Sequence, residues 1–302
     1  MAAESQVAGL QVAGSDRLAF SARAQRTRAV SVALSRIWRL LFPLVLIAAC
    51  IYLLAPTVVA VLASVSETAY LTFPPHGVSG KWYGNFLERD DFVGSLFFSL
   101  GLAIVVALLA VVVAVALARI IGRRRGIGRS SLTSMAYLPL ILPTIVYGPA
   151  LLLFAARIGL NADYGGALLT LGAAHLILAL PFAIQSVLVG YEGLDPALEE
   201  AAMSMGAKPR SVFRHVTLPL LMPSIVAGGT FAFLTSFDEP IVALFLSRAD
   251  MITLPVQIFT YLRFKPDPTV AAIATVMIVL SLIAVLIADR LVGLGKMMGL
   301  GK

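Results

Sequence analysis

An all-α integral membrane protein with six transmembrane helices is the fold class that this sequence predicts. The 302 residues are 59% hydrophobic and only 13% charged, whereas soluble domains carry about 25% charged residues. Long apolar runs separate the charged residues, and a helix of about 20 apolar residues is enough to cross a bilayer. The alternation of polar and apolar residues that is typical of strands is absent.

Six apolar runs are the predicted spans, each bounded by charged or polar residues. In chain order they are Leu40–Ser66, Phe92–Ala118, Ser130–Ala156, Tyr164–Tyr191, His215–Phe237 and Pro268–Ala288. We therefore expect residues 36–302 to form one six-helix domain embedded in the lipid bilayer, with both termini on the same side. Residues 1–35 are polar and rich in arginine, so we expect a disordered tail rather than a cleaved signal peptide.

The distribution of basic residues predicts the orientation in the membrane. Seventeen of the 23 Lys and Arg residues fall on the face that carries the two termini. Because Lys and Arg accumulate in cytoplasmic loops, we expect both termini in the cytoplasm. This distribution also accounts for the net charge of +7, so the charge gives little support for nucleic acid as a partner.

The segment of residues 192–219 lies between the fourth and fifth predicted spans, on the predicted cytoplasmic side. Asp195-Pro196 suits a helix start, because Asp can cap free N–H groups and Pro fits the first helical position. Gly206 suits the left-handed residue that ends a helix, and Pro209 is expected to begin a second short helix. The segment is either an ordinary loop with an interfacial helix or a rigid element that fits a partner's groove.

Residues at fixed spacing in this segment resemble the signature of permease subunits of ABC importers. The matching residues are Glu200-Ala201-Ala202, Gly206, Val216 and Leu218-Pro219, with valine at position 216 where isoleucine is commoner. Three further stretches, FPPHGVSGKWYGNF, SFDEPIVALFLS and TLPVQIFTYLRF, resemble the spermidine/putrescine branch of the family, in particular its second permease subunit.

This resemblance implies the type I ABC importer permease fold, with a cytoplasmic coupling helix, in the inner membrane of a bacterium. It implies three partners: a dimer of ABC ATPase subunits, a second permease subunit that is a different chain, and a periplasmic solute-binding protein. Glu200 would orient the coupling helix, Ala201 and Ala202 would allow close approach, and Gly206 would permit the turn. Val216, Leu218 and Pro219 complete the ATPase-coupling motif.

No nucleotide-binding loop of the pattern G-x-x-x-x-G-K-[ST] occurs in the chain. We therefore expect that the chain is not an enzyme, has no catalytic residue and binds no cofactor. ATP and Mg²⁺ would be used by the partner ATPase. His76, His175 and His215 lack metal-ligand spacing, so we expect structural histidines and no metal site.

Asp238 and Glu239 are the candidate residues of the substrate pathway. They follow the apolar run of the fifth span, about 28 Å along a helix from Pro219. They either mark the outer end of this helix or face a water-filled path, as acidic residues in membranes often do. Carboxylates would suit a polyamine cation. Alternative solutes are an aminophosphonate, thiamine or ferric iron, and a different class of protein would be an ion-coupled secondary transporter.

Overall fold

The computed structural model describes residues 38–39, 41–70, 73–122 and 127–292. Within these ranges the chain is built from helices and contains no β-strand beyond one isolated bridge. The chain divides into two units, residues 1–59 and 60–302. The helix Leu41–Ser64 begins in the first unit and ends in the second. The tail of residues 1–35 lies outside the described residues.

The second unit carries the remaining helices. In chain order they are α2 (Lys81–Leu87), α3 (Asp90–Gly122), α4 (Ile127–Ile141), α5 (Thr144–Arg157), α6 (Tyr164–Glu192), α7 (Pro196–Ser204), α8 (Pro209–Val212), the π-helix η1 (Phe213–Thr217), α9 (Leu218–Phe237), α10 (Ile241–Leu246), α11 (Leu254–Phe264) and α12 (Thr269–Val292).

Among the described residues, five single helices are long and apolar enough to cross a membrane. They are Leu41–Ser64, Asp90–Gly122, Tyr164–Glu192, Pro209–Phe237 and Thr269–Val292. Each corresponds to one predicted span, so the prediction of an all-helical membrane protein is confirmed.

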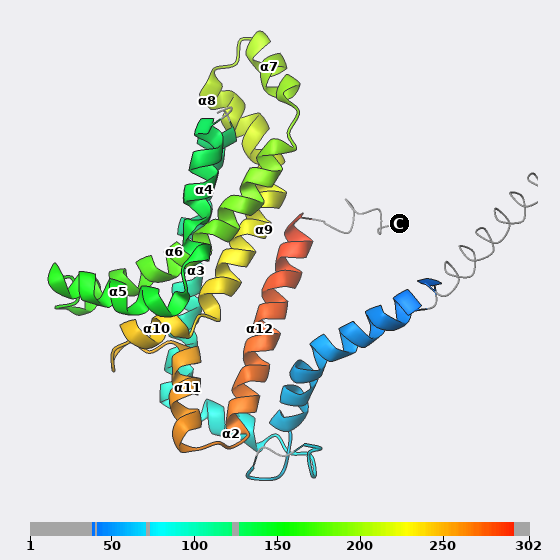
Figure 1. Ribbon diagram of the computed structural model, residues 1–302, viewed down its shortest axis with the longest axis vertical. Helices are drawn as coiled ribbons and strands as arrows, with labels where there is room; N and C mark the ends of the chain where they lie inside the picture. The colour runs from blue at the N-terminus through cyan, green and yellow to red at the C-terminus, as the bar shows by residue number, and fades with distance from the viewer. Residues whose placement is uncertain (1–37, 40, 71–72, 123–126, 293–302) are drawn as a thin grey trace, which may run out of the picture. The chain divides into compact units, whose positions relative to one another are not determined.

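The third span was predicted as one continuous run, and this prediction is wrong in its geometry. The chain forms two helices, α4 and α5, that are bent by 95° at a short break. Pro143 lies at the break with an extended backbone. It has no N–H to bond a carbonyl of the preceding turn, and its ring disfavours helical geometry at the residue before it. Figure 1 shows α5 lying across the direction of α4 and next to α10.

The core of the second unit consists of α3, α6 and α9, which lie side by side (Figure 1). Two contacts show the relative direction of α6 and α9: Gly228 faces Ala183, and Ser236 lies against His175. Later residues of one helix thus face earlier residues of the other, so α9 runs antiparallel to α6. A methyl group added at Gly228 would lie 3.1 Å from the carbonyl oxygen of Ala183. Glycine therefore allows the two backbones to approach closely, as small residues do between membrane helices.

This antiparallel pair positions the candidate site residues. The 192–219 segment connects the end of α6 to the start of α9, and Asp238 directly follows α9 at its opposite end. The two groups of residues singled out in the sequence thus lie at opposite ends of one helix.

Candidate functional site

Helix α7 is defined at both ends by local sequence, as predicted. The Asp195 side chain accepts a hydrogen bond from the backbone N–H of Ala197 at 2.9 Å, and Pro196 occupies the first turn. At the other end Gly206 has φ +86°, the left-handed conformation that glycine adopts without a Cβ penalty. The N–H groups of Gly206 and Ala207 donate to the carbonyls of Met203 and Ala202 at 2.9 and 3.1 Å. This pair of bonds is a Schellman motif, which satisfies the last carbonyls of a helix.

The second short helix predicted for this segment is not a separate element. Helix α8, the π-helix η1 and α9 follow one another without a break, so a single helical run extends from Pro209 to Phe237. Pro219 explains the π geometry, because it has no N–H for the carbonyl of His215, four residues earlier. The predicted bend therefore lies only between α7 and α8, at Gly206.

Side chains tie α7 to the beginning of this long helix. The hydroxyl group of Thr217 is fully buried and donates a hydrogen bond of 2.5 Å to the Glu199 carboxylate. Ala202 of α7 and Val212 of α8 are also buried. Hydrogen bonds to charged groups contribute about 1.5–3 kcal/mol, so these contacts hold α7 against α8 and η1, at the start of the long helix that continues into α9. The sequence analysis missed this link, because the two bonded residues lie on different helices.

One face of α7 is left exposed by these contacts. Glu200 and Ala201 lie on it, and Leu198, Met203 and Met205 are exposed beside them, Met205 to 83%. Such a mixture of apolar side chains and a carboxylate suits the groove of another protein.

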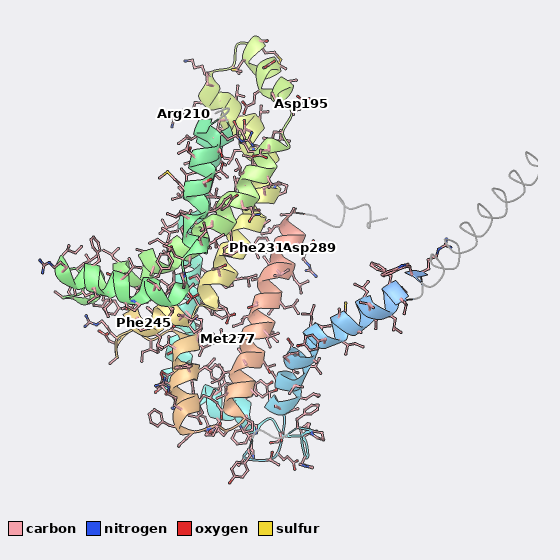
Figure 2. The ribbon with its side chains drawn as sticks, viewed as in Figure 1. Asp195, Arg210, Phe231, Phe245, Met277 and Asp289 are labelled. Atoms are coloured by element: carbon pink, nitrogen blue, oxygen red, sulfur yellow. The ribbon has the colours of Figure 1, made fainter. Side chains whose placement is uncertain are left out.

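The remaining residues of the signature lie inside or at the edge of the segment. Ala202 packs within it, Val216 and Leu218 are half-buried, and Gly206 and Pro219 are exposed. Figure 2 shows Asp195 at α7 and Arg210 at α8, at the same end of the bundle.

A polar cavity of about 500 Å³ lies beside the start of α7. Arg129 at the beginning of α4 forms an ion pair with Glu192 at the end of α6, and both residues line the cavity. Asp195 and Glu199 line it from α7 and its cap. The acidic groups next to the cavity already have partners: an arginine, a backbone N–H and a threonine hydroxyl. The cavity is thus framed by side chains that stabilise the segment.

Asp238 and Glu239 differ in what their carboxylates contact. One carboxylate oxygen of Glu239 accepts hydrogen bonds from the N–H groups of Ile241 and Val242, at 2.8 and 2.9 Å. Glu239 therefore caps α10. Asp238 is exposed, and within the described ranges its carboxylate has no hydrogen bond or ion pair. Nearby protein atoms still desolvate the group and raise the pKa of Asp238 above its ordinary value.

The three histidines lie apart from one another, and the described residues contain no group of His, Cys, Asp and Glu that could hold a metal ion. His175 is buried and contacts Ser236, His215 contacts Ser211 within its own helical turn, and His76 is exposed. The contacts of His175 and His215 fit the prediction that they are structural histidines.

Several apolar helices of bilayer length, around a small-residue core and with a capped polar segment at one end, define an integral membrane protein. The model of the family described as "binding-protein-dependent transport system inner membrane component" matches residues 114–293. The chain belongs to this family of ABC-importer permeases.

Two relatives agree with this assignment, and one solved structure shows the same fold. The chain is 33% identical to the putrescine transport system permease protein PotI of Escherichia coli K12, covering 80% of this chain and 85% of the relative. It is 30% identical to the spermidine/putrescine permease PotC of Haemophilus influenzae, covering 79% and 91%. A crystal structure of a bacterial ABC transporter that imports the acidic polysaccharide alginate has a similar fold, with TM-score 0.66 at 16% identity, covering 85% and 98% of the two chains.

The chain is therefore a permease subunit of an ABC importer and a multi-pass protein of the inner membrane. It is not an enzyme, since ATP hydrolysis belongs to a separate ATPase subunit. The family works with such an ATPase and with a substrate-binding protein. This membership excludes the ion-coupled secondary transporter that was considered from the sequence.

Proposed function

We propose that this permease imports polyamines, such as putrescine and spermidine, and that Asp238 lies on their path. The observation that carries the proposal is the Asp238 carboxylate, which is exposed and unpaired within the described residues at the end of α9. A polyamine is a chain of ammonium groups that loses hydration on entering a membrane, and a carboxylate replaces that hydration. The relatives named for putrescine and spermidine transport support this class of solute.

Coupling to ATP hydrolysis is assigned to the 192–219 segment. The exposed face of α7, with Glu200 and Ala201, would enter a groove of one subunit of an ATPase dimer that uses ATP and Mg²⁺. Gly206 sets the bend, and Val216, Leu218 and Pro219 connect the segment to the transmembrane helix. This assignment is supported by the hydrogen bond between Glu199 and Thr217, which joins α7 to η1. A displacement of α7 would pass through this bond into the continuous helix that ends just before Asp238.

The transport cycle would then be a rocking motion between two packed states. ATP would draw the ATPase subunits together, and each coupling helix would carry its permease from an inward-open to an outward-open arrangement. Nucleotide shifts this equilibrium only through contacts that differ between the two states. The second permease would be a different chain, a periplasmic solute-binding protein would deliver the polyamine, and both termini of this chain would lie in the cytoplasm.

Other solutes are the second candidate. The chain is 27% identical to the molybdenum transport system permease protein ModB of Haemophilus influenzae, over 66% of this chain, so the same machinery serves other solutes in relatives. An aminophosphonate, thiamine or ferric iron would use the same coupling segment. A carboxylate on the path favours cationic solutes over anionic ones.

The test is Asp238→Asn in the complete transporter, with ATPase, second permease and binding protein, in proteoliposomes. We expect putrescine uptake to fall about tenfold or more, because hydrogen bonds to a charged group contribute more than bonds to a neutral one. Assembly with the ATPase should be unchanged. Glu239→Gln is the matched control, since its amide oxygen can still cap α10, and we expect normal uptake.

Two results would contradict the proposal, each in a different part. Normal uptake by Asp238→Asn would remove Asp238 from the path. Absence of putrescine and spermidine uptake by the wild-type transporter would remove polyamines as the solute, while leaving the ABC-importer assignment intact.

A further inference from the structure

A buried histidine contacts the end of α9, two residues before Asp238. His175 of α6 is 1% exposed. Its Nδ1 lies 2.9 Å from the hydroxyl oxygen of Ser236 and 3.1 Å from the Ser236 carbonyl oxygen. Because a carbonyl oxygen can only accept, the hydrogen of the ring belongs on Nδ1, which donates to Ser236.

This contact satisfies a group that the helix itself leaves without a partner. Ser236 is the second-last residue of α9, and the last four carbonyls of a helix have no partner within it. An unsatisfied carbonyl is costly in a membrane, where water is scarce. His175 supplies the missing donor from the neighbouring helix. Its other nitrogen, Nε2, is buried and has no hydrogen-bond partner among the described residues, so the ring is held by Nδ1.

The residues around this contact fix the backbone that leads into Asp238. Phe237 is 1% exposed, and its ring stacks on Phe233 at a centroid distance of 5.5 Å. The N–H of Asp238 donates to the Leu234 carbonyl at 3.1 Å. The end of α9 is thus held by its own last turn, by Phe237 in a buried cluster with residues of α3, α11 and α12, and by the His175 contact from α6.

We propose that His175 is a positioning residue for the solute path: by binding the carbonyl end of α9, it holds Asp238 where it can receive a cationic solute. This inference rests on the proposed role of Asp238. Burial alone would suggest that this histidine only stabilises helix packing. The proposal gives it a role in transport as well.

A second bond between the same helices provides a control. Ser186 of α6 donates to the Ser224 carbonyl of α9 at 2.9 Å. Both bonds run from an α6 side chain to an α9 carbonyl, but Ser224 lies 14 residues before Asp238, about 21 Å along the helix. Loss of the Ser186 bond should weaken helix packing without moving Asp238.

The experiment measures putrescine uptake and ATP hydrolysis together, in proteoliposomes that hold the complete transporter and its binding protein. We expect His175→Leu to lower the number of putrescine molecules imported per ATP about three- to tenfold, the range that corresponds to the loss of one hydrogen bond. ATP hydrolysis should persist, because the 192–219 segment is intact. A defect of packing or assembly would instead lower uptake and hydrolysis in parallel.

Two further variants separate positioning from packing. His175→Asn places an amide N–H near the position of Nδ1, so we expect uptake per ATP to return close to wild type. Ser186→Ala should leave that ratio unchanged. The inference is overturned if His175→Asn is as defective as His175→Leu, if Ser186→Ala lowers the ratio equally, or if His175→Leu has no effect.

A double variant shows which proposal has failed. With Asp238→Asn already present, His175→Leu should lower the ratio no further, because there is no carboxylate left to position. If Asp238→Asn lowers the ratio and His175→Leu does not, only the positioning role is wrong. If Asp238→Asn alone has no effect, or the wild-type transporter imports no polyamine, the proposed function fails and this inference fails with it.

Discussion

The α6–α9 pair and the 192–219 segment are stabilised in opposite ways. The helix pair depends on residues far apart in the sequence, with Gly228 against Ala183 and His175 against Ser236. The segment depends mostly on residues within one or two turns of each other, such as the Asp195 cap and the Gly206 turn. The difference indicates that mutations that force the two helices of the pair apart should affect folding in the membrane, whereas mutations in the segment should affect coupling.

The largest effect is expected for Gly228→Leu in the helix pair. A side chain there would meet the backbone of Ala183, because even a methyl group would lie 3.1 Å from its carbonyl oxygen. Overpacking of a close interface costs about 1–3 kcal/mol, and more where backbone must move. We expect a large loss of folded protein in the membrane, measured as the yield of monodisperse protein after extraction with detergent. Uptake should fall in proportion.

Gly94→Leu is the control for that substitution. Gly94 also lies in a membrane helix, but apart from its chain neighbours and the backbone of its own helix no atom of the described residues lies within 4 Å of the position that its Cβ would occupy. Its folded yield should stay close to wild type. An equal loss of yield in both variants would mean that leucine in a membrane helix, rather than the α6–α9 contact, is responsible.

A smaller effect on stability, but a loss of coupling, is expected for Gly206→Leu in the segment. The space around Gly206 is open, so the only obstacle is φ +86°, which costs a non-glycine residue about 1–2 kcal/mol. We expect a normally inserted protein whose transporter neither uses nor stimulates ATP hydrolysis. Gly206→Asn should retain activity, because asparagine tolerates the left-handed conformation. Normal transport by Gly206→Leu would refute the coupling role of this turn.

The same contrast explains how much of the fold the sequence could predict. Hydrophobic length located five spans, and local chemistry located the cap at Asp195 and the turn at Gly206, because these depend on neighbouring residues. The third span was predicted as continuous although Pro143 lies within it, since apolar length alone does not reveal a 95° bend. The polar composition of the residues after Pro209 predicted a short helix separate from the fifth span. In the structure the backbone of this helix continues into α9.

The sites follow the same rule. Glu200 and Gly206 could be selected from spacing, and Asp238 from its charge at the end of an apolar run. The bond between Glu199 and Thr217, and that between His175 and Ser236, depend on helices that meet only in three dimensions. Glu239 was paired with Asp238 from adjacency alone, and its backbone capping contacts distinguish it only in the structure. These contacts are determined by tertiary packing, which cannot be inferred from the identity of any single residue.

The smallest effect is expected for Asp195→Ala, which removes the cap of α7 but leaves its turn at Gly206 and its hydrogen bond to Thr217 of η1. Loss of an N-terminal cap costs about 1 kcal/mol, and the cost falls on a short helix that is not needed for the membrane core. We expect unchanged yield, faster hydrogen exchange in α7, and a modest loss of ATP-coupled uptake. Asp195→Ser restores a capping oxygen without the charge, so exchange and uptake should both recover. If serine restores slow exchange but not uptake, the Asp195 carboxylate has a role beyond the cap, and local helix stability is not what limits coupling.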